Sequence, residues 1–473
     1  MQTRALMLMA VLGWLFCASV HAQTTMSSAP SSSIVLTLEE AVALGLRDNR
    51  QLRSVRLWRV VERFDLVLAR RAYLPTGQVS VSAIRRKNSY GDEQREWSVA
   101  PELYWNSPVG TKASAGWSSS GNLDRSDIGG ERFYATLRQP LLRGAGWDVN
   151  MAPLRQAHIN EALSQLRQQD AVADLIDRIV YAYRDLLQAQ DNLGLAEAAL
   201  ERSRDLMENN RLMIEAGRMA AFDIIQTEAD LANEQVALLE AQRNVGVSRT
   251  RLLNLLALES STPIRAIEQD EPAPVYIDPD DAVQTALQAR RDFKALRLDF
   301  EALVLAEKLA KNSRLWDLSV VAQYDRNSHR EFLPNISSHA VGVQLNVPLA
   351  DLSGRRNVRA AQTAILSAEL DYEDSVQRLD AQVREAVSDV NARWQQLQAA
   401  IRAGQLARES LDMQRERLLA GRASNFEVLS MQNRLRNADV QTLSARIAYL
   451  NALTSLDQVL GRTLETWRIS VES

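Results

Sequence analysis

The 473-residue sequence contains one cysteine, 12 prolines, 19 glycines and few aromatic residues, which make up 6% of the chain. A single cysteine excludes a disulfide framework and a zinc site built from cysteines. Beyond the N-terminus there is no apolar run of about 18 residues, so the sequence does not predict a bundle of membrane-spanning helices. The formal net charge of −4 argues against a protein that binds nucleic acid through its phosphates. This composition is typical of a chain dominated by long helices.

The N-terminal residues have the pattern of a secretory signal peptide. Arg4 supplies positive charge, a mostly apolar stretch follows, and Ala22 ends a small-residue cleavage motif, so we expect residues 1–22 to be removed. The alternatives are a short anchor helix and a lipid anchor on Cys17. The lipid anchor requires a small residue before the cysteine, but residue 16 is Phe. Cleavage would leave a mature chain without cysteine.

The rest of the chain is a duplicated unit. The segment 38–46 resembles 279–287, and 215–225 resembles 419–429, where each copy has Ala-Gly-Arg followed by Phe and an acid. A stretch rich in proline and acidic residues separates the copies and is typical of a linker. We therefore expect a flexible segment at 23–36, a first repeat at 37–258, a linker at 259–281, a second repeat at 282–461 and a tail at 462–473.

Each repeat is predicted to contain a helix, strands, a very long helix, a sharp turn and a second long helix. The segments 154–214 and 355–420 each contain one glycine and no proline. At 1.5 Å per residue, such segments form helices of about 90 Å. Their apolar residues follow a narrow seam between charged flanks, which favours lateral helix pairing. The sequence therefore predicts a mainly α protein with additional β structure.

The strand-like segments alternate between apolar residues and small or polar ones. Val79, Val81 and Ala83 are separated by Gln or Ser, and 341–347 shows the same period of two. A transmembrane β-barrel requires this alternation, and a soluble β-sandwich with one buried face gives the same pattern. Aromatic residues gather between 97 and 134, as a girdle at a membrane interface would require.

No motif for catalysis is present. The sequence lacks a nucleophile elbow, a phosphate-binding glycine loop and a zinc-protease helix motif, and its four histidines are scattered. We expect no enzymatic activity, no cofactor and no metal site.

Several features together resemble the TolC-type outer-membrane efflux family: the signal peptide, the duplication, the paired Ala-Gly-Arg turns, Gln139-Pro140-Leu141, and Pro348-Leu349 followed by Gly354. The resemblance covers residues 35–465. It implies a homotrimer in which strands from three chains close a β-barrel in the outer-membrane lipid, while the long helices form a continuous α-barrel across the periplasm.

The function that this resemblance implies is an exit duct of a tripartite efflux or type I secretion system. Its partners would be a periplasmic adaptor (membrane fusion) protein and an inner-membrane pump of the RND, ABC or another class, with no role for nucleic acid. The alternative from another class is a periplasmic coiled-coil adaptor or scaffold protein with a β-domain.

The resemblance also assigns roles to individual residues. Strand–helix transitions would lie at Pro75, Pro140, Pro348 and Gly354. The helix tips that would dock the adaptor are Ala216, Gly217, Arg218, Ala420, Gly421 and Arg422. Asp223 and Glu427 would form an acidic ring at the channel entrance, with six carboxylates in a trimer. The alternative for both acids is local, because the helix macrodipole favours an acid in the first turn by about 0.3–1 kcal/mol.

Two features depart from the family pattern. The second repeat shows two strands, whereas about 65 residues lie between Pro75 and Pro140, enough for four. The family's usual barrel takes two strands per repeat, so a hairpin near 96–120 either joins the barrel or folds beside it. In addition, Ala423 and Ser430 stand where the family carries a gating arginine and a second entrance acid, so no closing contact is carried over.

Overall fold

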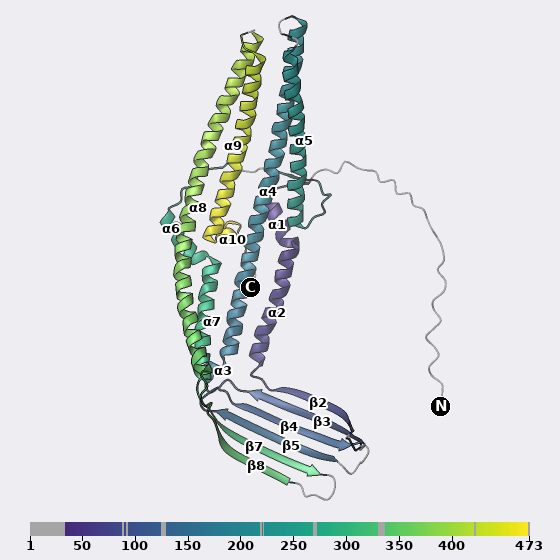
Figure 1. Ribbon diagram of the computed structural model, residues 1–473, viewed down its shortest axis with the longest axis vertical. Helices are drawn as coiled ribbons and strands as arrows, with labels where there is room; N and C mark the ends of the chain where they lie inside the picture. The colour runs from purple at the N-terminus through teal and green to yellow at the C-terminus, as the bar shows by residue number, and fades with distance from the viewer. Residues whose placement is uncertain are drawn as a thin grey trace, which may run out of the picture.

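A computed structural model describes residues 34–87, 89–90, 93–123, 129–217, 220, 222–267, 272–329, 336–420 and 422–471. The predicted signal peptide lies outside these ranges. The described chain has a tall layer of helices standing on one end of an antiparallel sheet (Figure 1). Within the described ranges, no helix has an apolar stretch sufficient to cross a membrane.

Two very long helices run for most of the height of the molecule, and each has a second long helix beside it in the half farther from the sheet (Figure 1). In the first repeat α4 (Ala152–Glu215, 64 residues) packs against α5 (Asp223–Leu256). In the second, α8 (Ser353–Leu419, 67 residues) packs against α9 (Asn425–Leu460). At 1.5 Å per residue, α4 and α8 each extend about 100 Å. Each pair forms a hairpin whose tip lies at the end farthest from the sheet.

A shorter, broken helix precedes the strands of each repeat. The sequence predicts one helix over 37–72, but the structure has α1 (Leu38–Asp48) and α2 (Arg50–Arg71), separated by Asn49 in an extended conformation. The Asn49 side chain caps α2 by accepting hydrogen bonds from the backbone N–H groups of Gln51 (2.9 Å) and Leu52 (3.1 Å). The second repeat has the same break at Arg290, between α6 (Pro279–Ala289) and α7 (Arg291–Ser313).

Three segments predicted as a flexible end, a linker and a tail contain ordered elements. The short strand β1 (Ile34–Leu36) pairs in parallel with β6 (Ile264–Ala266), which lies inside the predicted linker. The Tyr183 hydroxyl lies 2.8 Å from the carbonyl oxygen of Leu36 and 2.7 Å from that of Ile267. After α9, the short helix α10 (Thr463–Thr466) packs on α4. These contacts surround the central hydrophobic core, which α1, α4 and α5 share.

Six strands of the described chain form one antiparallel sheet in the order β2-β3-β4-β5-β7-β8. Four come from the first repeat: β2 (Thr76–Lys87), β3 (Glu93–Asn106), β4 (Lys112–Asn122) and β5 (Gly129–Pro140). The second repeat supplies β7 (Asp317–His329) and β8 (Ile336–Asn346). The hairpin near 96–120 therefore lies within the sheet and not beside it.

The register gives this sheet one apolar and one polar face. Successive paired residues Leu103, Ala115, Ala135 and Tyr324 lie on one face, because side chains of directly paired residues point the same way. The apolar residues of this face are Val79, Val81, Ala83, Trp97, Val99, Pro101, Leu103, Trp105, Ala113, Ala115, Trp117, Phe133, Ala135, Leu137, Leu318, Val320, Ala322, Tyr324, Val341, Val343 and Leu345. The opposite face is rich in serine, glutamine and charged residues.

Candidate functional site: helical tips and strand–helix transitions

The predicted transition residues lie where helices and strands meet. Pro75 directly precedes β2, and Pro140 is the last residue of β5. Pro348 lies between β8 and α8, and Gly354 is the second residue of α8. Proline is tolerated at these points because the strand ladder ends there.

The first hairpin tip ends α4 with a left-handed glycine. Ala216 is the C-cap and donates its N–H to the carbonyl of Leu212 (3.0 Å), and Gly217 follows with φ +71°. Glycine adopts this backbone conformation without strain, so it stops the helix. Arg218 lies outside the described residues. Asp223 is the first residue of α5, and its side chain also lies outside the described part.

The second tip is closed by backbone and side-chain caps. Ala420 is the C-cap of α8, and the Arg422 N–H donates to the carbonyl of Arg417 (2.8 Å). Gly421 lies outside the described residues. Glu427 and Ser424 form a capping box: the Glu427 N–H donates to Ser424 Oγ (3.3 Å), and the Ser424 N–H donates to Glu427 Oε2 (3.0 Å). Glu427 thus has a structural role at the start of α9, while its side chain remains exposed.

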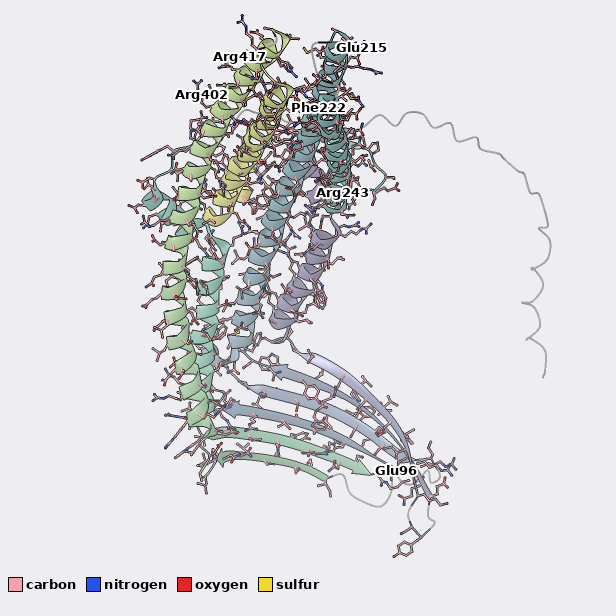
Figure 2. The ribbon with its side chains drawn as sticks, turned by 45° about the horizontal axis from the view of Figure 1, so that its top comes forward. Glu96, Glu215, Phe222, Arg243, Arg402 and Arg417 are labelled. Carbon is pink, nitrogen blue, oxygen red and sulfur yellow. The ribbon has the colours of Figure 1, made fainter. Side chains whose placement is uncertain are left out.

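Each tip exposes a phenylalanine at the corresponding position of the repeat. Phe222 is 73% exposed and Phe426 is 63% exposed. Figure 2 shows Phe222 near Glu215 at one tip, with Arg417 at the other. A large apolar side chain is therefore exposed at the equivalent place of each tip. The sequence comparison of the repeats aligned these residues but did not predict their exposure.

Behind the tips, a buried polar cluster joins the two hairpins. Asn210 of α4 donates from Nδ2 to Thr227 Oγ1 of α5 and to Asn425 Oδ1 of α9, both at 2.9 Å. Asn425 Nδ2 donates to the same Thr227 oxygen at 2.9 Å. Asn210 and Thr227 are fully buried, and Asn425 is nearly so. In the described part of the chain, Asn210 Oδ1 is buried without a hydrogen-bond partner.

A second contact between the hairpins is ionic. Arg436 of α9 donates from Nη1 to Oε1 of Glu234 on α5 at 2.6 Å, and Glu234 is only 5% exposed. Burial raises the pKa of Glu234, while the charge of Arg436 acts in the opposite direction. Arg202 of α4 lines the same small hollow, and burial lowers its pKa. Neither inter-hairpin contact can be predicted from the sequence, because polar residues on a long helix give no sign of which ones face a partner.

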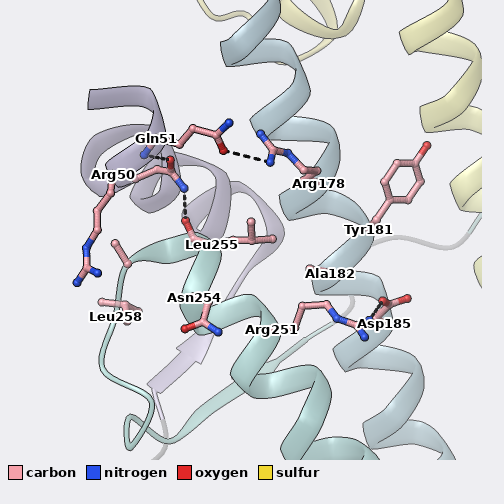
Figure 3. A pocket seen from close by; sticks show the side chains of 12 residues that line it. Arg50, Gln51, Arg178, Tyr181, Ala182, Asp185, Arg251, Asn254, Leu255 and Leu258 are labelled. Carbon is pink, nitrogen blue, oxygen red and sulfur yellow. Dashed lines mark hydrogen bonds and ion pairs between the residues drawn. The ribbon is translucent and has the colours of Figure 1, made fainter. Parts of the chain in front are cut away.

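A surface hollow of about 630 Å³ lies beside the α1–α2 break (Figure 3). Two of its arginines are paired: Arg178 Nη1 donates to Gln51 Oε1 (3.2 Å), and Arg251 Nη1 donates to Asp185 Oδ2 (2.9 Å). Asp185 is the one acid among the lining residues, which include no histidine or cysteine.

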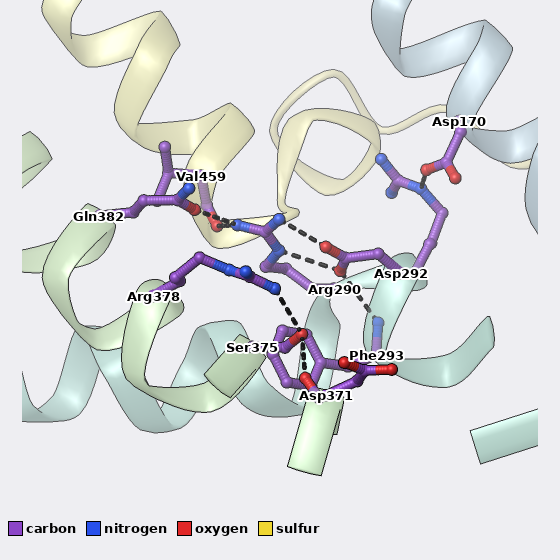
Figure 4. Close-up of polar contacts among 10 residues, drawn as sticks. Asp170, Arg290, Asp292, Phe293, Asp371, Ser375, Arg378, Gln382 and Val459 are labelled. Atoms are coloured by element: carbon purple, nitrogen blue, oxygen red, sulfur yellow. Dashed lines mark hydrogen bonds and ion pairs between the residues drawn. The ribbon is translucent and has the colours of Figure 1, made fainter. Parts of the chain in front are cut away.

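The matching break in the second repeat is held by an arginine junction (Figure 4). Arg290 donates from Nε to Asp292 Oδ1 (3.0 Å) and from Nη1 to the carbonyl of Val459 (3.3 Å) near the end of α9. Burial acts to raise the pKa of Asp292, but the bonds and charge of Arg290 hold it below its usual range. The positive charge also complements the C-terminal end of the α9 macrodipole.

Near this junction lies a buried acid, Asp177 of α4, which is 3% exposed. Burial, together with the charges of Asp174 and Asp457, raises its pKa to about 7, and the opposing influences are Thr463 and Arg291. Thr463 Oγ1 of α10 donates to Asp177 Oδ1 at 3.4 Å. The acid thus joins the C-terminal segment to the central helix.

Comparison with known proteins identifies the class of this architecture. Residues 282–462 match a family model described as outer membrane efflux protein. The chain is 23% identical over 456 residues to the proteases secretion protein PrtF of Dickeya chrysanthemi, with 92% of this chain and 90% of that protein covered. It is 26% identical over 352 residues to the alkaline protease secretion protein AprF of Pseudomonas aeruginosa, covering 68% and 67% of the two chains.

The fold is similar to that of the Campylobacter jejuni CmeC outer membrane channel, with a TM-score of 0.70, 15% identity, and coverage of 90% of this chain and 86% of that one. The chain resembles the TolC-type outer-membrane efflux family, with the family match lying in its second repeat and the similarity to PrtF extending over most of its length. Members of this family are outer-membrane channels and not enzymes, so the chain is an outer-membrane transport protein that extends into the periplasm. The expected resemblance is thereby confirmed.

Proposed function

We propose that the chain assembles as a homotrimer and forms the outer-membrane exit duct of a tripartite efflux or type I secretion system. The observation that carries this proposal is the two-faced sheet joined to helices of about 100 Å. An apolar face suits contact with lipid, and a polar face suits a water-filled lumen. Three sheets would close one β-barrel, and the helices would continue it as an α-barrel across the periplasm.

The two edge strands of the sheet, β2 and β8, would pair between neighbouring chains in this assembly. Both strands are exposed along almost their whole length. An open edge presents unpaired backbone donors and acceptors, which closure of a barrel satisfies. Pairing β8 of one chain with β2 of the next would remove every edge.

The helical tips would be the periplasmic end of the duct. The exposed side chains of Phe222, at the tip of the first repeat, and Phe426, at the tip of the second, would supply apolar contacts for a periplasmic adaptor protein. Asp223 and Glu427 would place six carboxylates around the axis of a trimer and favour cations at the entrance. The capping role of Glu427 is compatible with this, because one of its oxygens serves the cap and the side chain remains exposed.

The relatives named for protease secretion suggest a polypeptide as the exported substrate. The chain itself would hydrolyse nothing, and an inner-membrane pump would supply the energy. Co-purification after cross-linking in intact cells, followed by mass spectrometry, would identify that pump.

Membrane fractionation tests the proposal as a whole. The full-length protein should sediment with the outer membrane and migrate as a trimer that heating converts to a monomer. Recovery as a soluble periplasmic monomer would contradict the proposal and would favour the alternative, a periplasmic adaptor or scaffold protein.

A further inference from the structure

The two repeats contribute unequally to the sheet. The second supplies two strands, β7 and β8, whereas the first supplies four. The extra pair is the hairpin of β3 and β4, which lies between β2 and β5. Without it, β2 and β5 would still run antiparallel to each other, so the duplication by itself would give a four-stranded sheet.

The hairpin is fitted to both of its neighbours. β3 pairs with β2 over twelve residue pairs from Thr76–Tyr104 to Lys87–Glu93, and β4 pairs with β5 from Lys112–Arg138 to Gly121–Gly129. Gly116 of β4 faces Tyr134 of β5, where an added Cβ would lie 2.6 Å from the Tyr134 ring. The apolar and polar faces continue across both strands without a break, as an inserted barrel hairpin requires.

The turn between β3 and β4 packs against the loop that follows β5, at the strand–helix transition. Ser107 and Thr111 close the turn through a hydrogen bond from the Ser107 N–H to the Thr111 carbonyl (2.8 Å). The Gly146 N–H donates to the Val109 carbonyl at 3.2 Å. Gly110 has φ +98°, and a Cβ there would lie 2.4 Å from the Gly144 carbonyl oxygen. Position 110 therefore requires glycine, because any Cβ would clash where the turn meets the 140–146 loop.

Closure of three such sheets fixes the strand number. The six-stranded sheet of each chain has an even number of strands, so β8 of one chain would run antiparallel to β2 of the next. Three such sheets would give a barrel of eighteen strands. With strands about 4.8 Å apart and tilted by about 40°, eighteen strands make a barrel roughly 36 Å across between backbones, against roughly 24 Å for twelve.

We propose that the β3–β4 hairpin is a barrel-widening insertion, which makes the outer-membrane exit an eighteen-stranded barrel with a cross-section about twice that of a twelve-stranded one. This inference rests on the proposed trimeric duct and deepens it. After about 5 Å of side chain on each wall, the lumen would be about 26 Å wide, enough for a polypeptide with helices of about 10–12 Å, whereas twelve strands would leave about 14 Å.

Electron microscopy of the full-length trimer in lipid nanodiscs counts the strands directly. Eighteen strands, with β3 and β4 between β2 and β5, is the expected result. A trimer with a twelve-stranded barrel and the hairpin outside it would overturn the widening while leaving the duct intact. A particle without a threefold barrel would instead overturn the proposed function.

A polymer-size assay tests the consequence of widening. Gln323→Cys places a thiol on the polar face of β7, and the mature chain is expected to have no other. A matched variant would join Lys87 to Gly129 through an Asn-Gly turn, which removes β3 and β4 and keeps apolar residues of β2 and β5 on one face. Maleimide-polyethylene glycols of graded size would be added from outside the cell.

The full-length trimer should admit larger polymers to the introduced thiol than the deletion variant does, with the accessible cross-section of the lumen falling about threefold on deletion. An equal size limit in two folded trimers would overturn the inference. If the deletion variant yields no trimer, the strand count of the full-length protein decides the question.

Discussion

Arg436 of α9 donates a hydrogen bond of 2.6 Å from Nη1 to Oε1 of the buried Glu234 on α5. This contact joins the two helical hairpins of one chain behind their tips. The helices concerned come from different repeats, so the ion pair couples the halves of the duplicated unit. Its partners are unequally exposed, since the Arg436 side chain is 34% exposed and that of Glu234 is 7%.

Arg436→Met should destabilise the protein, because it leaves the Glu234 carboxylate buried without its cationic partner. The expected loss in the free energy of unfolding is about 1–3 kcal/mol. The double variant Glu234→Gln/Arg436→Met should lose less, since it removes the buried charge as well. Chemical denaturation of the purified protein would measure both. Equal stability of the wild type and Arg436→Met would show that the pair carries no net stabilisation.

Gly110→Ala should impair folding of the sheet. A Cβ at this position meets a backbone carbonyl oxygen that cannot swing aside, and φ +98° is strained for alanine. We expect a loss of more than about 1 kcal/mol and a lower yield of heat-modifiable trimer. Gly342→Ala in β8 is the control, because a Cβ there has no atom within 4 Å among the described residues. Comparable yields from both variants would refute the tight fit of the turn.

Asp177 should make the helical region less stable as the pH rises from about 4 to about 7. Burial raises the pKa of this acid to about 7 in the folded state, while the unfolded value is about 3.9. In that interval the folded state holds a proton that the unfolded state has released, so the free energy of unfolding decreases as pH rises. Asp177→Asn keeps the shape without the charge. It should raise the thermal midpoint at pH 8 more than at pH 5.

Two acids outside the fully buried set, Asp191 and Asp457, also have pKa values raised by partial desolvation, so the variant will retain some pH dependence. The difference between Asp177→Asn and the wild type isolates this residue. A difference that is the same at both pH values would contradict the assignment.

The acidic entrance can be tested without disturbing the helix cap. Glu427→Gln retains a side chain that can complete the capping box with Ser424 and removes only the charge. Combined with Asp223→Asn, it should lower the ratio of cation to anion permeability several-fold in single-channel recordings. Glu215→Gln, at the exposed end of α4, is the matched control. Unchanged selectivity in the double variant would leave Glu427 with its capping role alone.

The sequence predicted the parts of this structure that depend on local pattern. The long helices were predicted from segments poor in glycine and proline, the strands from their period of two, and the turn after α4 from Gly217. The break at Asn49 was missed because an N-cap residue within a continuous apolar pattern also reads as part of one helix.

Contacts between distant segments required the folded chain. Asn210, Thr227 and Asn425 meet only because two hairpins pack together, and nothing in any one helix distinguishes them from solvated polar residues. The hairpin near 96–120 shows the same limit: its alternation predicts strands, but its place between β2 and β5 depends on pairing partners on both sides.

Reconstitution of the purified full-length trimer into planar lipid bilayers tests the central claim, a continuous aqueous duct, most directly. The account predicts discrete conductance steps that are cation-selective and weaken when Asp223 and Glu427 lose their charge. A folded trimer that inserts into the bilayer and passes no ions at any voltage would contradict it.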